Sequence, residues 1–337
     1  MGPLPDALGH ILDSHVAHWP GSGAAGALVG PGPAALPHPA PEPLSEAATS
    51  AAGDTDKALA WASVTKLLVA LACLVAVEEG TVALEDSCGP DGSTLAHLLA
   101  HASGLPFEGH QPIAPPARRR IYSNTGIEVA AAHLEARSGL PAAEYIRAGV
   151  LEPLGMTATV VEGSPAHGGR GPLGDLLRLA GELLSPTLVS APTWQQAVSV
   201  AWAGLSGVVP GFGRQDPCDW GLGPEIRGHK SPHWTGATNS PATYGHFGQS
   251  GSFVWVDPIA GIALCGLSTT PFGAWAKQAW PALSDDVLAQ WAGTSTRTTR
   301  GGSSGPAAGA TGATGPTEPT EPTEPTGPTG PTGPTER

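Results

Sequence analysis

The chain contains a serine and a lysine three residues apart, in the segment Ser63-Val-Thr-Lys66 that precedes a long apolar run. Residues with this spacing share one face of a helix, so the amine of Lys66 would lie close to the hydroxyl of Ser63. Serine becomes a strong nucleophile when a base takes its proton, and a lysine in a low-dielectric pocket can be that base. Backbone N–H groups at a helix N-terminus would also favour developing negative charge. The pair therefore predicts a serine nucleophile at the start of a helix.

The same pattern also describes a helix cap followed by a surface lysine. Only four lysines occur in the chain, and Lys66 alone has a serine three positions before it. The helix expected after Lys66 is almost wholly apolar, which is an unusual setting for a solvated lysine. These two observations favour the catalytic interpretation.

A second motif, Tyr122-Ser123-Asn124, lies at an expected loop-to-helix junction. Taken alone it is better explained as a helix cap with a packed tyrosine. Asn occurs at only two positions, 124 and 239, and only Asn124 has a tyrosine two residues before it.

A third motif, His246-Phe247-Gly248, leads into two strand-like runs. A rival copy over residues 167–169 lies in a Gly/Pro-rich loop with no strand expected after it, and we discard it.

Strand-like and helical segments would position these motifs. A strand over Ala58–Trp61 is expected to lead into Ser63, and a helix over Leu67–Glu79 to follow it. Strands at both ends of the chain, with helices between, predict a sheet built from the two ends and a helical region inserted at about residues 67–221. Further helices are expected over Asp6–Val16, Leu95–Ala102, Gly126–Ser138, Ala142–Val150 and Ala274–Trp291, a strand over Ala25–Val29, and a hairpin over Ser252–Val256 and Gly261–Leu267.

The order Ser-x-x-Lys, Tyr-x-Asn, His-x-Gly resembles the serine β-lactamase and penicillin-binding superfamily. Within this superfamily, the chain resembles the branch that contains class C β-lactamases, D-alanyl-D-alanine carboxypeptidases and related esterases. The flanking segments SVTKLL, VEEGTVALED, LLAHASGLP, YSNTG, LEPLGM and GHFGQSGSFVWVDP carry the resemblance from about Trp61 to Ser268. It implies an α/β (α+β) sandwich, in which helices flank an antiparallel sheet, with neither a metal nor an organic cofactor.

The resemblance also implies a role for each matching residue. Ser63 would be the nucleophile, Lys66 its activating amine, and Tyr122 a general base or proton shuttle. Asn124 would form a hydrogen bond with Lys66 or with the substrate amide. The backbone N–H groups of Ser63 and Gln249 would form the oxyanion hole.

The third motif departs from the Lys-Thr-Gly of typical β-lactamases, because His246 and Phe247 precede Gly248. Histidine is mostly neutral near pH 7, and phenylalanine donates no hydrogen bond, so binding of a substrate carboxylate should be weak. We therefore expect hydrolysis of an ester or amide through an acyl-enzyme. The alternatives are a D-alanyl-D-alanine peptidase or β-lactamase, and a catalytically silent binding protein; the intact set of motif residues argues against the last.

The composition of the chain limits the kinds of binding partner that we expect. The formal net charge is −13, so nucleic acid is not expected. No run of 18 apolar residues could span a membrane, and the N-terminal segment lacks the pattern of a signal peptide. We expect a cytoplasmic enzyme with a small-molecule acyl substrate.

Other candidate sites are weaker. GGSSG at Gly301–Gly305 lacks the strand–turn–helix context of a nucleophile elbow. His97 and His101 are four apart on an expected helix, a spacing that can bind zinc, but no glutamate follows His97 directly and we expect no metal site. Trp220 and Trp234 lie in Gly/Pro-rich loops, where they are candidates for lining an acyl pocket.

The C-terminal segment differs in composition from the rest. From Gly309 the chain runs in triplets such as GPT and EPT, and glutamate interrupts the glycine repeat that a collagen helix needs. We expect one hydrolase domain over residues 1–295 and a disordered tail over residues 296–337.

Overall fold

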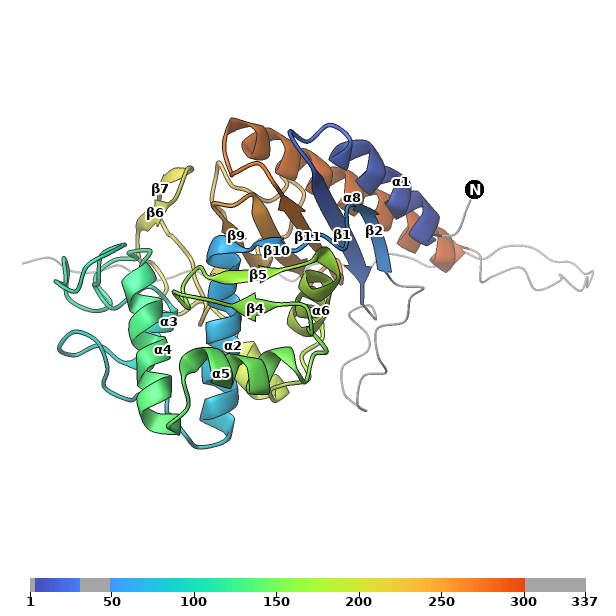
Figure 1. Cartoon of the computed structure of the whole chain (residues 1–337). Helices are drawn as coiled ribbons and strands as arrows, with labels where there is room; N and C mark the ends of the chain where they lie inside the picture. Colours follow the sequence, from blue (N-terminus) through green and yellow to red (C-terminus); the bar gives the residue numbers. More distant parts are fainter. Residues whose placement is uncertain (1–3, 31–48, 301–337) are drawn as a thin grey trace, which may run out of the picture.

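The computed structural model describes residues 4–30 and 49–300. Its centre is a six-stranded antiparallel sheet in the order β2-β1-β11-β10-β9-β8 (Figure 1). The first part of the chain supplies β1 (Gly23–Val29) and β2 (Thr49–Gly53). The last part supplies β8 (Glu225–Ile226), β9 (Tyr244–Gly248), β10 (Ser252–Asp257) and β11 (Ile262–Ser268). The two ends of the chain therefore build one sheet.

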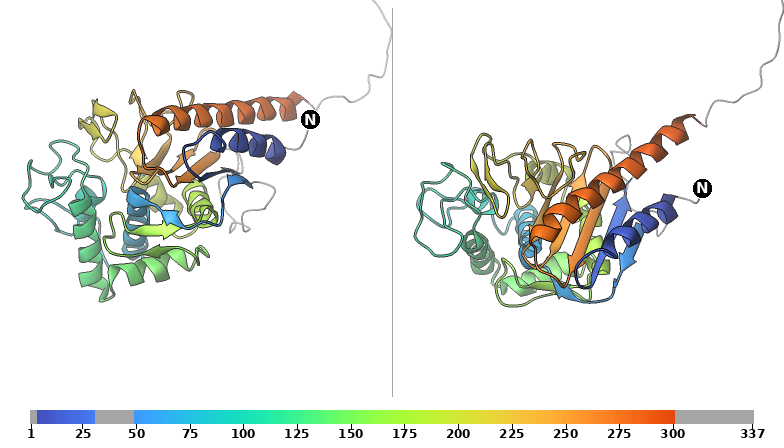
Figure 2. Two further views of the ribbon diagram at one scale, coloured as in Figure 1. Left: turned by 45° about the horizontal axis from the view of Figure 1, so that its top comes forward. Right: turned by 90° about the horizontal axis from the view of Figure 1, so that it is seen from above.

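Helices cover both faces of this sheet. Helices α1 (Leu4–Val16) and α8 (Ala274–Arg300) lie side by side over one face (Figure 2), and α6 (Leu173–Leu184) packs on the other. Alternate residues of a strand point to opposite faces. In β10, Phe253 and Trp255 accordingly join the core beneath α8, whereas Val254 and Val256 join the larger core beneath α6.

The helical region between the two parts of the sheet begins with α2 (Thr65–Glu78). Every residue of α2 from Thr65 to Leu74 is buried, as expected for a helix that is apolar on all sides. The other helices are α3 (Leu95–Leu99), α4 (Asn124–Ser138), α5 (Ala142–Ile146) with a π-helical turn at Arg147–Leu151, and α7 (Ala191–Ala197). Two small sheets complete it: β3 (Leu59–Ala60), β5 (Gly169–Gly171) and β4 (Val160–Val161), and β6 (Gly207–Val209) with β7 (Gly213–Gln215).

The predicted fold class is confirmed: helices flank an antiparallel sheet made from the chain ends, with a helical region between them. Some element boundaries differ from the prediction. Helix α3 ends at Leu99 rather than Ala102, and α8 continues beyond Trp291 to Arg300. The repeats from Gly309 onward lie outside the described residues. Within the described part of the chain, no helix combines the length and apolar character needed to span a bilayer.

Candidate active site

Ser63 lies in a 3-10 turn, Ala62–Val64, directly before α2. Ala62 has a φ of 43°, a conformation that residues with a Cβ adopt rarely and at a cost in strain. The Thr65 hydroxyl donates to the Ala62 carbonyl at 2.6 Å and accepts from the Gly169 N–H at 2.9 Å. These bonds fix the turn that presents the Ser63 hydroxyl.

The Lys66 amine has three polar neighbours. Its Nζ lies 3.1 Å from Ser63 Oγ, 2.7 Å from Asn124 Oδ1 and 2.9 Å from the Ala166 carbonyl oxygen. The last two atoms can only accept hydrogen bonds. A neutral amine has two N–H groups and one lone pair, so pairing both N–H groups with Asn124 and Ala166 leaves the lone pair for the Ser63 hydroxyl.

The Lys66 side chain is fully buried. Burial lowers the pKa of Lys66 from 10.5 to about 7, and the nearby Glu128 carboxylate acts in the opposite direction. A substantial fraction of Lys66 is therefore neutral at physiological pH, which is the form that can accept a proton from Ser63.

Tyr122 completes the group around Ser63. Its side chain hydrogen-bonds Ser63, and its ring centroid lies 4.9 Å from Lys66 Nζ. Burial raises the pKa of Tyr122 well above its ordinary value, while the hydrogen bond with Ser63 lowers it. The phenol is accordingly protonated near neutral pH and is placed to exchange a proton with Ser63.

Strand β9 lies against the turn that carries Ser63. A Cβ added to Gly248 would lie 2.4 Å from the Trp61 carbonyl oxygen, so only glycine permits this approach. The Ser252 hydroxyl donates to the same carbonyl at 2.6 Å, and the Ser250 hydroxyl donates to the Ala60 carbonyl at 2.7 Å. Gln249 follows Gly248, and its exposed side chain bonds the Phe272 carbonyl at 3.3 Å. Any role of Gln249 at this turn must therefore come from its backbone.

His246 is buried and lies in β9. This strand directly precedes β10 and β11, which form the predicted hairpin. Its Nδ1 lies 2.8 Å from the Phe247 carbonyl oxygen, which can only accept, so Nδ1 carries the hydrogen and Nε2 keeps its lone pair. Burial and the charge of Lys66 lower the pKa of His246 to about 4. The side chain at the third motif is therefore uncharged at neutral pH.

A backbone segment that the sequence reading discarded lies at the site. Residues 167–169 lead into β5, which begins at Gly169, contrary to the expectation that no strand follows them. The neighbouring Ala166 carbonyl accepts from Lys66. The His167 side chain is exposed. Ser164 ties this segment to α4, since its hydroxyl donates to Glu128 Oε1 at 2.6 Å and accepts from the Ala166 N–H at 3.1 Å. A carbonyl contribution carries no side-chain signature, so the sequence offered no signal for it.

The two histidines considered for zinc do not share a helix face. Because α3 ends at Leu99, His101 lies beyond it with a φ of 53°. The His101 ring packs 4.8 Å from the Tyr122 ring, and its Nδ1 accepts from the Ser123 N–H at 3.2 Å. His97 instead stacks on Trp202 at 4.1 Å. The helical spacing behind the zinc alternative was wrong, and His101 supports Tyr122.

Arg120, part of the basic run at residues 118–120, is buried beside Tyr122. Its guanidinium donates to the carbonyls of Ala100, Ala201 (2.6 Å) and Cys218 (3.2 Å). One side chain thus holds together three segments that are far apart in the sequence.

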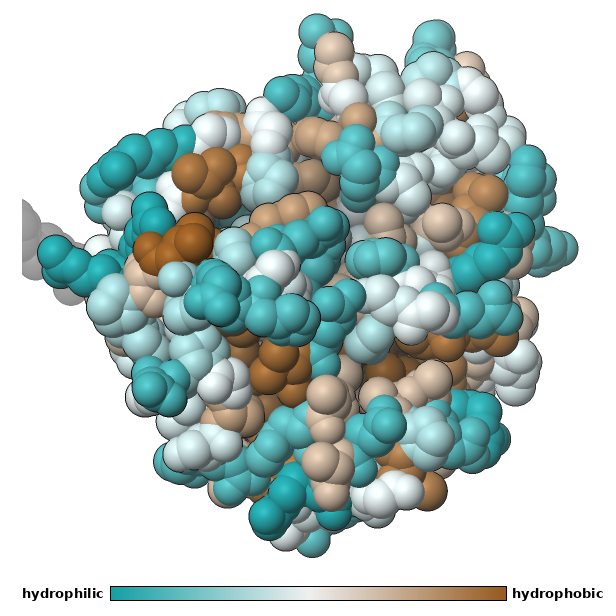
Figure 3. All heavy atoms as spheres, turned by 60° about the vertical axis from the view of Figure 1, so that its left-hand side comes forward, coloured by the Kyte–Doolittle hydropathy of each residue, from teal (hydrophilic) through white to brown (hydrophobic). Residues whose placement is uncertain are grey.

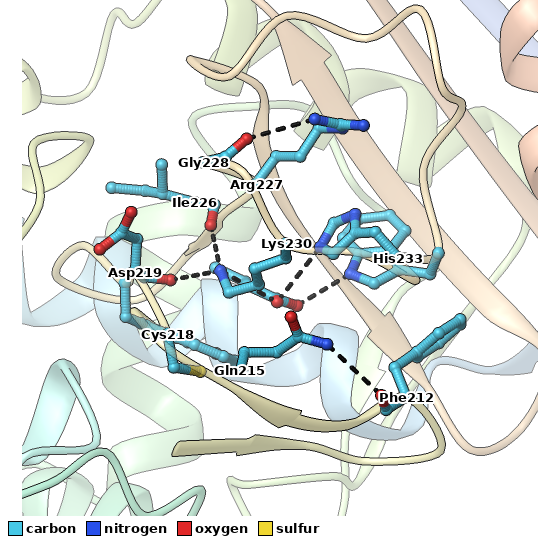
Figure 4. Close-up of polar contacts among 12 residues, drawn as sticks. Phe212, Gln215, Cys218, Asp219, Ile226, Arg227, Gly228, Lys230 and His233 are labelled. Atoms are coloured by element: carbon cyan, nitrogen blue, oxygen red, sulfur yellow. Dashed lines mark hydrogen bonds and ion pairs between the residues drawn. The ribbon is translucent and has the colours of Figure 1, made fainter. Parts of the chain in front are cut away.

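A buried ionic cluster, which the sequence did not predict, is built around Glu225, the first residue of β8 (Figure 4). Glu225 Oε1 lies 3.3 Å from Lys230 Nζ and 3.2 Å from His233 Nε2, and Glu225 Oε2 accepts from Trp234 Nε1 at 2.8 Å. Lys230 also donates to the Asp219 carbonyl at 2.7 Å. Burial raises the pKa of Glu225, but Lys230 and His233 outweigh it and bring the pKa to about 2. The carboxylate is therefore ionised throughout the physiological range.

This cluster fixes the loop that carries Trp220. The Trp220 ring lies 5.8 Å from the His246 ring and 5.9 Å from the Tyr122 ring, so it packs against the site. Trp234 differs, since it belongs to the ionic cluster and packs 5.6 Å from Phe247. Of the two tryptophans considered for a substrate pocket, only Trp220 lies beside Tyr122.

The chain is similar to known proteins in sequence and fold. The family model described as Beta-lactamase matches residues 40–289. The crystal structure of a β-lactamase from Mycobacterium bovis, Mb2281c, is 48% identical, with 82% of this chain and 98% of that chain covered and a TM-score of 0.75.

Two other similarities either cover a smaller share of the chain or have a lower sequence identity. Penicillin-binding protein 4* of Bacillus subtilis is 28% identical over 140 residues, which span 32% of this chain and only 31% of that protein. The structure of EstCE1, described as a hydrolase with promiscuous acyltransferase activity, shares the fold at 16% identity, with a TM-score of 0.66 over 85% of this chain and 98% of that chain. The chain belongs to the Beta-lactamase family.

Proposed function

We propose that this protein is a serine hydrolase that cleaves an ester or amide through an acyl-enzyme on Ser63. The observation that carries the proposal is the environment of Lys66. Two acceptors, Asn124 Oδ1 and the Ala166 carbonyl, match the two N–H groups of a neutral amine, and the third neighbour is the Ser63 hydroxyl. Relatives in this family include hydrolases, which supports the same reaction class.

Acylation begins when the Ser63 proton passes to Lys66, directly or through Tyr122, as Oγ attacks the substrate carbonyl. The negative charge on the carbonyl oxygen is stabilised by the backbone N–H groups of Ser63 and Gln249. The bond to the alcohol or amine then breaks, and the proton moves through Tyr122 to the departing heteroatom. Lys66 is neutral again when the acyl-enzyme has formed.

Deacylation repeats these steps with water in place of the leaving group. Because its pKa is raised, Tyr122 acts as a proton shuttle between water and Lys66 rather than as a standing phenolate base. The proton taken from water finally returns to Ser63 Oγ as the acid product leaves.

The uncharged His246 separates this site from those that bind a substrate carboxylate with a lysine. Neutral imidazole with its hydrogen on Nδ1 offers a lone pair at Nε2, and an anion needs a donor or a cation there. Esters and amides without a carboxylate at this position are therefore better substrates than β-lactams or D-alanyl-D-alanine peptides.

Turnover of p-nitrophenyl butyrate and labelling by a fluorescent penicillin test the proposal. We expect hydrolysis that is lost in Ser63→Ala and Lys66→Ala and retained in Lys57→Ala, an exposed lysine used as the matched control. Stronger labelling by penicillin than turnover of the ester would indicate a penicillin-binding or peptidase function. Equal, background activity in the wild type and Ser63→Ala with both probes would refute the proposal.

A further inference from the structure

A cavity of about 500 Å³ opens beside Tyr122. Binding sites for small molecules have volumes in this range. Tyr122 belongs to both the candidate active site and this cavity, since its side chain hydrogen-bonds Ser63 and also lines the cavity. Tyr122 is therefore the side chain that links the cavity to the group around Ser63.

Apolar side chains are concentrated at this cavity. Phe107, Ile113 and Val208 line it and are 50%, 55% and 59% exposed. They make up three of the seven large apolar side chains that are exposed in the described part of the chain. Figure 3 brings this side of the molecule forward and shows apolar side chains set in hollows among hydrophilic ones. Apolar groups gathered in this way next to Tyr122 indicate a surface that a ligand covers.

Positive charge borders the same cavity, although the whole chain carries a formal charge of −13. Arg119 and Arg214 both line it. Arg214 pairs with Asp216 at 3.1 Å, whereas Arg119 donates only to the Ile113 carbonyl at 3.3 Å and joins no ion pair among the described residues. Arg119 is therefore the cation available to a bound anion.

The position of Tyr122 indicates which part of a substrate lies here. During acylation the departing oxygen or nitrogen must receive a proton, and the donor must lie within hydrogen-bond distance of it. If Tyr122 passes that proton, the leaving group lies on the Tyr122 side of Ser63, where the cavity opens.

We infer that the cavity holds the alcohol or amine portion of the substrate, and that this portion is amphipathic, with an apolar chain against Phe107, Ile113 and Val208 and an anionic group at Arg119. The inference rests on the proposed function, because it assigns the leaving group of that reaction. The same site accepts a free alcohol of this kind after acylation. The alcohol oxygen then bonds to the acyl carbon, the bond to Ser63 Oγ breaks, and the alcohol proton passes through Tyr122 to Ser63.

Butyrate esters of ω-hydroxycarboxylic acids of increasing length test the inference, with the corresponding primary amides as uncharged counterparts. Beyond the shortest members, the reactivity of the alkyl alcohol barely changes with length, so a trend reports binding in the cavity. We expect kcat/KM to rise by up to about fourfold per added methylene until the cavity is full. The carboxylates should exceed the amides by about twofold to fivefold, and high salt should reduce this preference.

Paired variants separate the two parts of the inference. Ile113→Asn should flatten the dependence on chain length, whereas Ile259→Asn, at an exposed isoleucine in the β10–β11 turn, should keep it. Arg119→Gln should remove the preference for carboxylates, whereas Arg118→Gln, at an exposed arginine that does not line the cavity, should keep it.

The outcomes distinguish this inference from the proposed function. A flat chain-length profile in the wild type, or equal profiles in Ile113→Asn and Ile259→Asn, would overturn the assignment of the leaving group while Ser63-dependent hydrolysis stands. Equal rates for carboxylates and amides would overturn the anionic part alone. If no ester in the series nor p-nitrophenyl butyrate shows turnover above Ser63→Ala, the proposed function itself fails.

Discussion

The amine of Lys66 on α2 lies 2.7 Å from the amide oxygen of Asn124, the first residue of α4. This contact joins two helices whose starting residues are about sixty positions apart in the chain. Since the amide oxygen is uncharged, it orients the amine without stabilising its protonated form as strongly as a carboxylate would. The first two predictions concern the balance between the neutral and protonated forms of Lys66.

The pH dependence of kcat/KM should follow the ionisation of Lys66. Its pKa is lowered from 10.5 to about 7 by burial, and the proposed reaction needs the neutral amine. We expect kcat/KM for a neutral ester to rise with pH through about 7 and then level off. A rate that does not change between about pH 6 and pH 8.5 would argue against Lys66 as the proton acceptor.

Substitutions on either side of Lys66 should shift this profile in opposite directions. Asn124→Asp places a carboxylate beside the amine, which should raise the pKa of Lys66 and move the rise in kcat/KM to higher pH by about one unit or more. Glu128→Gln removes a carboxylate that raises the pKa of Lys66, so the rise should move to lower pH. Both profiles come from initial rates with one ester. Shifts in the same direction would show that structural damage, not charge, caused them.

Gly248→Ala should disable the enzyme with little effect on its secondary structure. The added methyl group would meet the Trp61 carbonyl at 2.4 Å and push β9 away from the Ser63 turn. A displacement near 1 Å at a reacting group lowers kcat by about a hundredfold. Gly174→Ala is the matched control, because no atom lies within 4 Å of a Cβ added there. Comparable kcat values for the two variants would contradict the close packing of β9 on this turn.

Replacing one partner of the Glu225–Lys230 ion pair should lower the stability of the protein markedly. Both side chains are almost fully buried, and removal of one partner from a buried ion pair costs about 3–5 kcal/mol. We expect Glu225→Gln to lower the free energy of unfolding in urea by about this amount. The double variant with Lys230→Met should recover part of the loss, because it removes the unpaired cation. A double variant as unstable as the sum of the two single ones would show that the residues do not act as a pair.

The sequence was sufficient to predict that side chains at short, regular spacing lie close together. Ser63 and Lys66 lie one helical turn apart, and the order of the three motifs matched a family whose fold is confirmed here. The hairpin of β10 and β11 was predictable because alternating apolar residues flank a turn.

Other parts of the site depend on how distant loops fold. The Ala166 carbonyl acts through its backbone, so no residue type marks it. Arg120 looked like one member of a basic run, and only the surrounding carbonyls of Ala100, Ala201 and Cys218 account for its burial. Glu225 and Lys230 lie in a Gly/Pro-rich segment whose turns determine which charges meet. Spacing along a sequence does not encode contacts of this kind.

Mass spectrometry of the acid-quenched protein during turnover of p-nitrophenyl butyrate tests the central claim most directly. We expect a fraction of the wild-type protein to gain the mass of one butyryl group, and the modification to map to the peptide that contains Ser63. Asn124→Asp should accumulate the adduct more slowly below pH 7, and Ser63→Ala should carry none. A butyryl group on another residue, or turnover without any adduct at the earliest quench times, would contradict an acyl-enzyme on Ser63.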